Sequence, residues 1–548
     1  MYERIKKLTK DLVAVSSVNG TSGERKIGDF IYNYISSFPY FQKHPDQIMA
    51  VDLKNDPLGR RNIIALLIGE KDKACRDTIL LHGHIDTVAV EDFGNLKPYA
   101  FDCDKLQEKL MEIQDELEEE VREDLLSGDY MFGRGVTDMK SGDAVHITVL
   151  EEFAKHPEKL RGNIMVSFNP VEETLHRGFI EAVDTFVALK EKYDLNYLFA
   201  INNDYTCGMY PKDETRYIYT GSVGKVLPSF FIKGKETHVG QPFEGVDACR
   251  IGAELVRRIN LNVDLCDGYK GEYPAPPTAL QMRDLKPSYN VQTPYKVFVY
   301  FNYMVHNQGT AEILDKMVSI AQDAVEAVQE EMNRRYQDYC RKIGAAQSTL
   351  KPGIEVLTYR DLLEKASEKY EGDMDTFVRE KAEQSIARGE DKRVTSEKIV
   401  EDLLKIAGLQ NPAVVVFFAT PHCPHNTLKD EVPEEKKLAE EILELVKEFE
   451  KESGEHFQML HFFPSLTDSS YLKIDDDPDS IRALTENFPA QDLLYPVPYD
   501  KIRVLNMPGI NYGSFGKDAH KRMERVKMSY TFGELPRLLI KTLEKYLG

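Results

Sequence analysis

Five short stretches of this chain each end in a side chain of a type that binds metal ions. They are Leu81-His82-Gly83-His84-Ile85-Asp86, Gly133-Arg134-Gly135-Val136-Thr137-Asp138, Val171-Glu172-Glu173, Asn202-Asn203-Asp204 and Gly516-Lys517-Asp518-Ala519-His520. Two divalent ions about 3.5–4 Å apart can share and deprotonate a water, which gives the strong nucleophile that amide hydrolysis requires near neutral pH. Imidazole and carboxylate ligands suit catalytic zinc, and cobalt or manganese would also fit. The sequence therefore indicates a two-metal hydrolytic site.

The motif at residues 84–86 places two of these side chains on one side of an extended strand end, because side chains alternate there with a period of two. We expect the His84 imidazole to bind one metal ion. The Asp86 carboxylate would accept a hydrogen bond from the other ring nitrogen and so fix the tautomer. Taken alone, the motif is more typical of a strand-end histidine bonded to backbone. His82 lies deeper in the strand and is the less favoured ligand.

Three further carboxylates have distinct predicted roles. Asp138 follows a glycine-containing turn and precedes a predicted helix, so it is either a ligand that bridges two ions or a helix N-cap. The adjacent charges of Glu172 and Glu173 at a strand end are unfavourable unless cations or protons compensate them. We expect Glu173 to bind a metal ion. Glu172 would take a proton from the bridging water and pass it to the leaving amine. An exposed acidic pair is the alternative.

The last two candidate ligands each complete the shell of one ion. Asp204 follows two asparagines and would complete the shell of the first metal ion, on the side of His84. His520 follows a glycine-containing loop and would complete the shell of the second, beside Glu173. Because both are residue types that bind zinc, the predicted set has ligands for two ions.

The first part of the chain alternates helical and strand patterns, which is typical of a layered α/β fold with a mainly parallel sheet. The predicted elements are helices at 3–16, 24–34 and 139–154 and strands at 62–68, 78–82, 163–169 and 198–201. His84, the Glu172–Glu173 pair and Asp204 each follow one of these strands. Open α/β sheets bind ligands beyond the carboxyl ends of their strands, so the motif positions and the strand pattern agree.

The pattern changes near residue 221. The predicted order is a strand at 223–232, a helix at 246–259, strands at 278–283 and 296–304, a helix at 310–343 and strands at 354–359 and 414–419. A βαββαβ order of this kind indicates a smaller α+β domain inserted into the first. We expect a catalytic domain at 1–220 and 426–548, and a lid or dimerisation domain at 221–425 that carries a helical insertion at about 360–410.

The catalytic domain contains two further predicted regions, its second part after residue 426 and an acidic segment between the first two motifs. In the second part of the catalytic domain, a helix at 434–451 is predicted, with strands near 459–463 and 504–506 that rejoin the main sheet. The acidic segment at 104–126 reads as a helix with a solvated face, because runs of charge usually lie at the surface. We therefore assign no catalytic role to that segment.

Composition limits the functional classes. The 548 residues are 42% hydrophobic and 29% charged, which describes a globular protein with a large core. The formal net charge of −21 argues against a general nucleic-acid or membrane-surface binder, because both partners are anionic. The seven cysteines are scattered and form no CxxC pair, and neither a signal-peptide layout nor a bilayer-crossing run is found. We therefore expect a cytoplasmic protein with free thiols.

Taken together, these residues resemble the M20 family of zinc aminopeptidases, carboxypeptidases and aminoacylases. The matching positions are His84 with Asp86, 133–140, Glu172 with Glu173, Asp204, His520 with Glu524, 234–238 with Pro242, 245–248 and 465–468. Agreement at this many ordered sites is far more specific than any single motif. The resemblance covers most of the chain, except 104–126 and 360–410.

The resemblance implies a three-layer catalytic domain with a mainly parallel sheet and an inserted lid that forms a homodimer. The implied metal ligands are His84 and Asp204 for one Zn²⁺, Glu173 and His520 for the other, and Asp138 as the bridge. His238 would reach the active site of the partner subunit and donate a hydrogen bond to the developing oxyanion. A surface histidine at a strand end is the alternative for His238.

Within this family, the chain is most similar to the arginine-utilisation proteins, on its length, its insertions and the stretches at 169–174 and 419–425. This implies a role in amino-acid catabolism. Many family members carry, after a position like Asn290, a strand ending in Asp-x-Arg whose arginine holds a substrate carboxylate. Here the strand ends in Asn302-Tyr303-Met304, so another residue binds that carboxylate or the substrate lacks it. His422 and His425 could form a further metal site, but we expect them to be exposed in a proline-rich turn.

The leading hypothesis is a dimeric two-metal amidohydrolase or peptidase that acts on a small peptide or an N-acylated amino acid, with two Zn²⁺ per subunit and neither nucleic acid nor membrane as a partner. A second hypothesis, also an enzyme, is a hydrolase whose substrates are confined to metabolites of the arginine pathway. A catalytically silent member that binds a metabolite or serves as a scaffold is the alternative from another class. The missing lid arginine motivates that alternative, and the complete set of candidate ligands argues against it.

Overall fold

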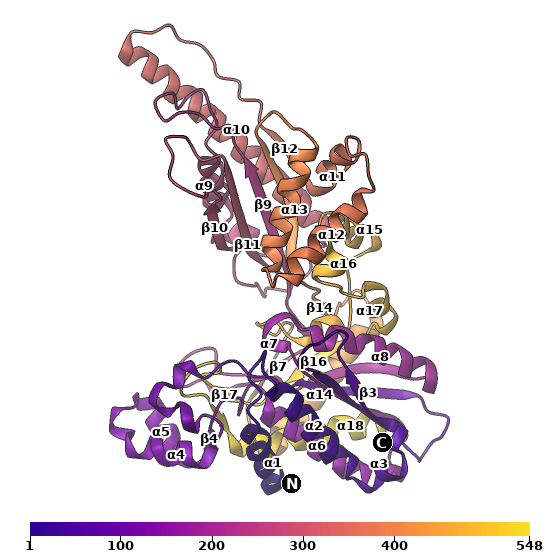
Figure 1. The fold of residues 1–548 in the computed structure, drawn as a ribbon. Helices are drawn as coiled ribbons and strands as arrows, with labels where there is room; N and C mark the ends of the chain where they lie inside the picture. The colour runs from indigo at the N-terminus through magenta and orange to yellow at the C-terminus, as the bar shows by residue number, and fades with distance from the viewer. The chain divides into compact units, whose positions relative to one another are not determined.

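The computed structural model describes residues 1–548, which divide into two compact units (Figure 1). Unit 1 contains residues 1–222, 426–474 and 498–548, and unit 2 contains residues 223–425 and 475–497. The sequence pattern assigns 475–497 to the catalytic domain, but the structure places this segment in unit 2. There α15 (Pro478–Glu486) packs against α10 (Thr310–Ile343), and Leu494 of α16 (Gln491–Leu494) is buried in a hydrophobic core of that unit.

Unit 1 is built on an eight-stranded mixed sheet with the order β1-β2-β5-β3-β6-β16-β7-β15. The strands are β1 (Ile48–Asp52), β2 (Arg61–Leu67), β5 (Asn163–Asn169), β3 (Asp77–His84), β6 (Asn196–Asn202), β16 (Gly509–Tyr512), β7 (Arg216–Tyr219) and β15 (Phe457–Leu460). The central strands β5, β3, β6 and β16 run parallel to one another, whereas β1, β2 and β7 add antiparallel pairings. The predicted α/β sheet, mainly parallel at its centre, is confirmed.

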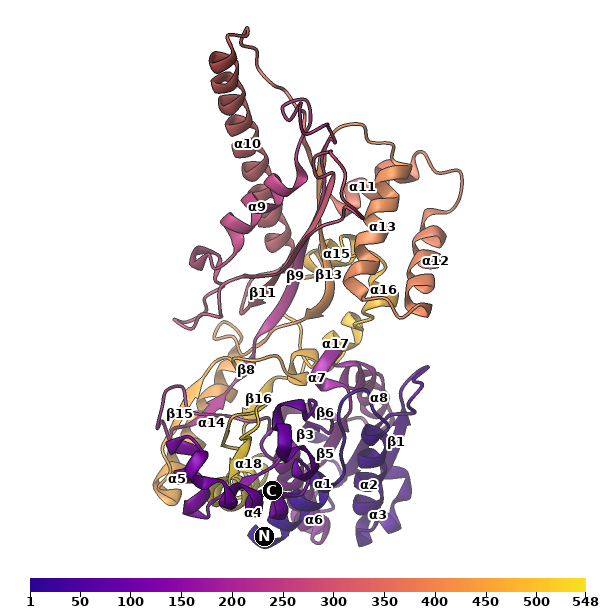
Figure 2. The same ribbon diagram turned by 60° about the vertical axis from the view of Figure 1, so that its left-hand side comes forward.

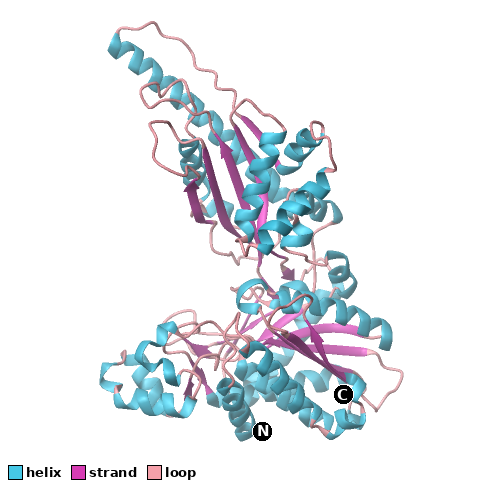
Figure 3. Ribbon diagram, in the orientation of Figure 1, coloured by secondary structure: helices cyan, strands magenta, loops and turns pink.

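Helices cover both faces of this sheet, as Figures 2 and 3 show. The helices that share one large core are α1 (Tyr2–Ala14), α2 (Gly23–Ser36), α6 (Lys140–Ala154), α14 (Pro433–Ser453) and α18 (Leu535–Leu547). On the opposite face, Phe179 of α8 (Arg177–Tyr193) lies against the ring of His82, 4.9 Å between centroids. Because the central strands are covered on both sides, β3 and β5 are almost wholly buried, and each contains a short unbroken apolar run, at 79–81 and 164–166.

The predicted strand at 504–506 is wrong. These residues follow or end α17 (Tyr499–Leu505), and the strand that returns to the sheet is β16, a few residues later. Asn506 adopts a left-handed conformation with φ of 41°, which ends the helix. Short apolar stretches lie on both sides of Asn506. The periodicity of such a short stretch does not show whether it forms a helix or a strand.

The acidic segment at 104–126 forms two helices, α4 (Cys103–Glu112) and α5 (Glu119–Ser127). Glu116, Glu118 and Glu119 are exposed, in agreement with the predicted solvated face. The apolar faces of α4 and α5 pack together with β4 (Tyr130–Phe132) and form a small hydrophobic core of their own. The insertion is therefore a packed part of unit 1.

Unit 2 contains a five-stranded sheet with the order β10-β11-β9-β13-β12. The strands are β10 (Thr278–Asp284), β11 (Lys296–Val305), β9 (Gly224–Lys233), β13 (Ala413–Cys423) and β12 (Glu355–Thr358). Helices α9 (Ala248–Ile259) and α10 contact this sheet, and α11 (Tyr359–Ser367), α12 (Met374–Ala387) and α13 (Lys392–Ile406) share a core with Phe231, Phe298 and Phe417. The segment at 360–410 is helical, as its pattern predicts.

The histidines of the proline-rich stretch in unit 2 are buried, and the prediction that they are exposed is wrong. His422 is 2% exposed and His425 is 3% exposed. The stretch continues β13 across an irregularity between Ala419 and Cys423 instead of leaving the sheet as a turn. Burial lowers the pKa of His422 to about 3.

Two expectations drawn from composition can be compared with the structure. All seven cysteines are free, as their scattered positions predict. None of the helices combines the length and the apolar character needed to cross a bilayer.

Candidate metal centre

Six of the predicted residues meet at the carboxyl edge of the central sheet of unit 1. His84 ends β3, Glu172 and Glu173 follow β5, and Asp204 follows β6. Asp138 precedes α6, and His520 lies in the loop between β17 (Gly516–Lys517) and β18 (Arg525–Lys527). Their potential ligand atoms form three overlapping groups, each within 4.8 Å: His84, Asp138 and Asp204; His84, Glu172 and Glu173; and Asp138, Glu173 and His520.

Asp138 lies between the two histidines. Its Oδ1 is 2.8 Å from Nε2 of His84, and its Oδ2 is 3.0 Å from Nε2 of His520. The same nitrogen of His520 is 3.1 Å from Oε1 of Glu173. The two oxygens of Asp138 thus face two different imidazoles, one on each side.

The site has more acidic than basic groups. Burial, followed by the charge of Asp138, raises the pKa of Asp204 to about 8. Burial, together with the neighbouring Glu173 and Asp468, raises the pKa of Glu172 well above its usual range. Hydrogen bonds to Asp138 and Glu173 raise the pKa of His520 to about 11. This excess of negative charge is what divalent cations would neutralise, so the residues present fit metal ions.

Asp86 does not make the predicted hydrogen bond to His84. The Nδ1 atom of His84 is 3.1 Å from the backbone oxygen of Asp86, whereas the nearest carboxylate oxygen of Asp86 is 3.8 Å away. That carboxylate instead accepts hydrogen bonds from Asn19 Nδ2 at 2.7 Å and from the backbone N–H groups of Glu172 and Glu173 at 3.0 and 3.1 Å. Asp86 therefore fixes the turn that carries the two glutamates.

That turn is the single-turn helix α7 (Glu172–Leu175), and its backbone is strained at both ends. Val171 before it has φ of 72° and His176 after it has φ of 53°. The left-handed region is uncommon for any residue other than glycine and an outlier for a β-branched one. Such conformations cost on the order of 1–3 kcal/mol and cluster at functional sites. Sequence reasoning missed this feature, because valine does not signal a left-handed turn.

The backbone before Asp138 is held by a buried ion pair. Arg134 Nη1 is 2.7 Å from Oε2 of Glu524, and both side chains are 1% exposed. The other oxygen of Glu524 accepts a hydrogen bond from the backbone N–H of Thr137 at 3.2 Å. The arginine of the 133–138 motif and the glutamate after His520 thus act together on the position of Asp138.

We expect Arg134→Met to lower the free energy of unfolding by about 3–5 kcal/mol, because it leaves the buried carboxylate of Glu524 without its partner. Urea unfolding followed by circular dichroism measures this change. The matched control is Arg482→Met, since Arg482 is exposed and pairs only with Asp479 on its own helix. The control is expected to change stability by less than about 0.5 kcal/mol. Equal midpoints for the two variants would contradict the role given to Arg134.

The loop that carries His520 is anchored by the α4–α5 insertion. Asp124 of α5 lies 2.7 Å from Nε of Arg525 and 2.9 Å from Nζ of Lys517. Arg525 also pairs with Asp518 in the same loop. These ion pairs tie both sides of the loop to the insertion, so the segment at 104–126 positions His520 although it has no ligand of its own.

Two other predicted histidines lie outside the cluster. His82 is fully buried, its Nε2 is 2.9 Å from the hydroxyl of Ser469, and burial lowers its pKa to about 3. It is therefore a core histidine. His238 belongs to unit 2, where it is exposed and its Nδ1 accepts a hydrogen bond from the backbone N–H of Gly240 at 3.0 Å. Its role toward an oxyanion stays a prediction.

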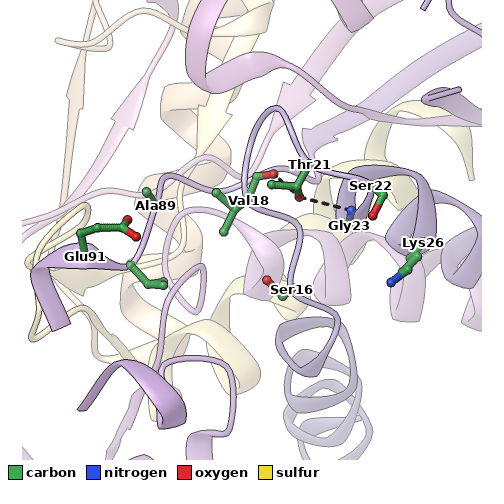
Figure 4. Close-up of a pocket in the computed structure, with 9 residues that line it drawn as sticks. Ser16, Val18, Thr21, Ser22, Gly23, Lys26, Ala89 and Glu91 are labelled. Atoms are coloured by element: carbon green, nitrogen blue, oxygen red, sulfur yellow. Dashed lines mark hydrogen bonds between the residues drawn. The ribbon is translucent and has the colours of Figure 1, made fainter. Parts of the chain in front are cut away.

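Unit 1 also has a surface pocket of about 350 Å³ that is separate from these ligands (Figure 4). Its lining residues are Ser16, Val18, Thr21, Ser22, Gly23, Lys26, Ala89, Val90 and Glu91. The hydroxyl of Thr21 donates to the carbonyl of Val18 and accepts from the N–H of Gly23, so this polar group serves the loop itself. None of the candidate ligands lines this pocket.

Comparisons with known proteins show the family and the fold of this chain. Residues 80–447 match the model of peptidase family M20/M25/M40. Protein RocB of Bacillus subtilis (strain 168) is 38% identical over 542 residues, which cover 98% of this chain and 94% of RocB. Protein YqjN of the same organism is 33% identical over 542 residues, which cover 98% of this chain and 96% of YqjN. The solved structure of the aminopeptidase PepT from Bacillus cereus ATCC 10987 aligns with 100% of this chain and 99% of its own, with a TM-score of 0.53 and 13% identity, a likeness of fold.

Proposed function

This chain belongs to peptidase family M20/M25/M40 and is a hydrolase, and from this premise we propose that it is a two-metal enzyme that cleaves an amide bond of a small peptide or an N-acyl amino acid. The observation that carries the proposal is the position of Asp138, whose two oxygens face His84 and His520 at 2.8 and 3.0 Å. His84 and Asp204 would hold one ion, and Glu173 and His520 the other. Bound divalent ions, zinc in our proposal, would supply the positive charge that acidifies a water and polarises a carbonyl.

Glu172 is the proposed general base. A carboxylate oxygen of Glu172 lies within 4.8 Å of a ring nitrogen of His84 and of a carboxylate oxygen of Glu173. Since Glu173 is assigned to a metal ion, Glu172 is the member of the acidic pair that remains free to act as a base. It takes a proton from the attacking water and later gives that proton to the leaving nitrogen. Asp86 keeps Glu172 in place through the backbone of α7, and Glu524 keeps Asp138 in place through the backbone of Thr137.

The finer parts of the proposal rest on the family resemblance. We propose a homodimer formed through unit 2, in which the exposed His238 serves the active site of the partner subunit. We also propose a cytoplasmic role in arginine catabolism, which the stretches at 169–174 and 419–425 support by their similarity to the arginine-utilisation proteins. Many family members bind a substrate carboxylate through an arginine at the end of the strand that corresponds to β11, but β11 contains no arginine. We therefore propose that another residue binds the substrate carboxylate, if the substrate has one.

The test is metal analysis of the purified protein combined with hydrolysis assays over dipeptides and N-acyl amino acids, including derivatives of arginine. We expect turnover of at least one class, loss of turnover after chelation, and recovery when Zn²⁺ is added back. Absence of hydrolysis of every amide by protein with a full complement of zinc would overturn the proposal in favour of a binding or scaffold role. Comparable rates on unrelated acyl amino acids would remove the restriction to arginine metabolites.

A further inference from the structure

A buried histidine and a buried aspartate, neither of them a candidate metal ligand, lie beside the proposed base. The Nδ1 atom of His176 is 3.0 Å from Oδ1 of Asp468 and 3.6 Å from Oε1 of Glu172. The side chains of His176 and Asp468 are 4% and 3% exposed. The imidazole ring also packs against Tyr471, with 5.4 Å between ring centroids. One ring nitrogen therefore faces two carboxylates, that of the buried Asp468 and that of Glu172, whose side chain is 11% exposed.

The chain holds His176 at this place by local geometry. His176 comes four residues after Glu172, at the end of α7, and side chains at this spacing lie next to each other on one side of a helical turn. Its left-handed backbone, with φ of 53°, lies between α7 and the start of α8. A histidine in this conformation is uncommon, so the surrounding contacts must hold the backbone there.

Asp468 comes from a distant segment that is tied to the same sheet. It begins η6 (Asp468–Tyr471), and 292 residues separate it from His176. Thr467 before it accepts a hydrogen bond from Asn202, at the end of β6, at 2.8 Å. Ser469 after it bonds to His82 of β3 at 2.9 Å. The two strands that present Asp204 and His84 therefore also place Asp468.

We propose that His176 is a positioning residue for Glu172, and that Asp468 fixes the orientation of its ring. Because an ionised carboxylate can only accept a hydrogen bond, the 3.0 Å contact with Asp468 assigns the proton to Nδ1 of His176. The nitrogen of that N–H lies 3.6 Å from Oε1 of Glu172. A fixed N–H beside one oxygen restricts rotation of the carboxylate and so holds it in the orientation needed to accept a proton from water. This inference rests on the proposed function, because it takes Glu172 as the base. Hydrogen-bond partners that orient metal ligands contribute roughly 10–100-fold to metal affinity or activity, and we expect an effect of that size for a residue that orients the base.

The test compares His176→Phe, which keeps a ring and removes the N–H, with His176→Asn, which keeps an N–H donor near the position of Nδ1. In the zinc-loaded protein, we expect His176→Phe to lower kcat by roughly 10–100-fold at unchanged KM and zinc content, and His176→Asn to restore most of that loss. The control is His156→Phe, an exposed histidine beyond the end of α6, with no expected effect. A wild-type kcat for His176→Phe, or equal losses for the two His176 variants, would overturn the proposal.

A double-mutant comparison separates this role from a structural one. If His176 acts through Glu172, His176→Phe should lower the residual kcat of Glu172→Gln no further, because interacting residues are not additive. A further 10-fold loss in that background would overturn the proposal. Full activity of Glu172→Gln alone would instead refute the base of the proposed function. If His176→Phe does not fold, Asp468→Asn takes its place, with about a 10-fold loss of kcat expected, and an unchanged kcat would count against the inference.

Crystal structures of metal-free protein give a readout that does not depend on activity. We expect one orientation of the Glu172 carboxylate in the wild type and more than one in His176→Phe. The same single orientation in both proteins would overturn the positioning role, whatever substrate the enzyme uses.

Discussion

Replacing Glu172 by glutamine is expected to lower kcat by roughly 10²–10⁴-fold, with zinc content unchanged. The amide has the shape of the carboxylate but cannot take a proton from water, and Glu172 is not one of the residues assigned to hold an ion. Steady-state kinetics on any amide that the wild type hydrolyses, with metal analysis of the same samples, measures the effect.

The matched control for this prediction is Glu158→Gln, in an exposed short helix of unit 1, where a proton acceptor has no part in the proposed chemistry. Its kinetics are expected to be those of the wild type. Unchanged hydrolysis by Glu172→Gln would mean that the base is assigned to the wrong residue. A loss of zinc together with activity would mean that Glu172 is a ligand.

Replacing Asp138 by alanine is expected to reduce the affinity for both ions and to abolish hydrolysis, because each of its oxygens faces one of the two histidines. Replacing His84 or His520 removes a ligand from one ion only, so each of those variants is expected to keep the other. Zinc content after dialysis against a zinc buffer of fixed free concentration, measured by mass spectrometry, separates these outcomes.

The control for the aspartate variant is Asp323→Ala on α10, where the side chain is 61% exposed. Its zinc content is expected to equal that of the wild type. Full zinc content in Asp138→Ala would contradict the bridging role. Loss of only one ion from that variant would show that Asp138 serves a single site.

The convergence of the ligands could be predicted from sequence because it follows from the α/β sheet. Parallel strands bring their carboxyl ends to one edge, so the residues after β3, β5 and β6 must meet there. Asp138 and His520 do not follow central strands. Their residue types and the glycine-containing turns before them make them candidates, and the resemblance to a known family supports that choice. The structure shows that the Arg134–Glu524 ion pair links their two segments.

The features that could not be predicted depend on tertiary contacts. The partner of Asp86 is the backbone of α7, and no pattern in the residue types distinguishes this from the expected contact with His84. The link between His176 and Asp468 joins residues 292 positions apart. The helix α17 replaced a predicted strand because a short apolar run is compatible with either element.

X-ray diffraction at the zinc absorption edge, on crystals of the zinc-loaded protein, tests the central claim most directly. The predicted result is two anomalous peaks about 3.5–4 Å apart, one beside His84 and Asp204 and the other beside Glu173 and His520, with Asp138 contacting both. Peaks that lie elsewhere, or a pair that does not share Asp138, would contradict the account.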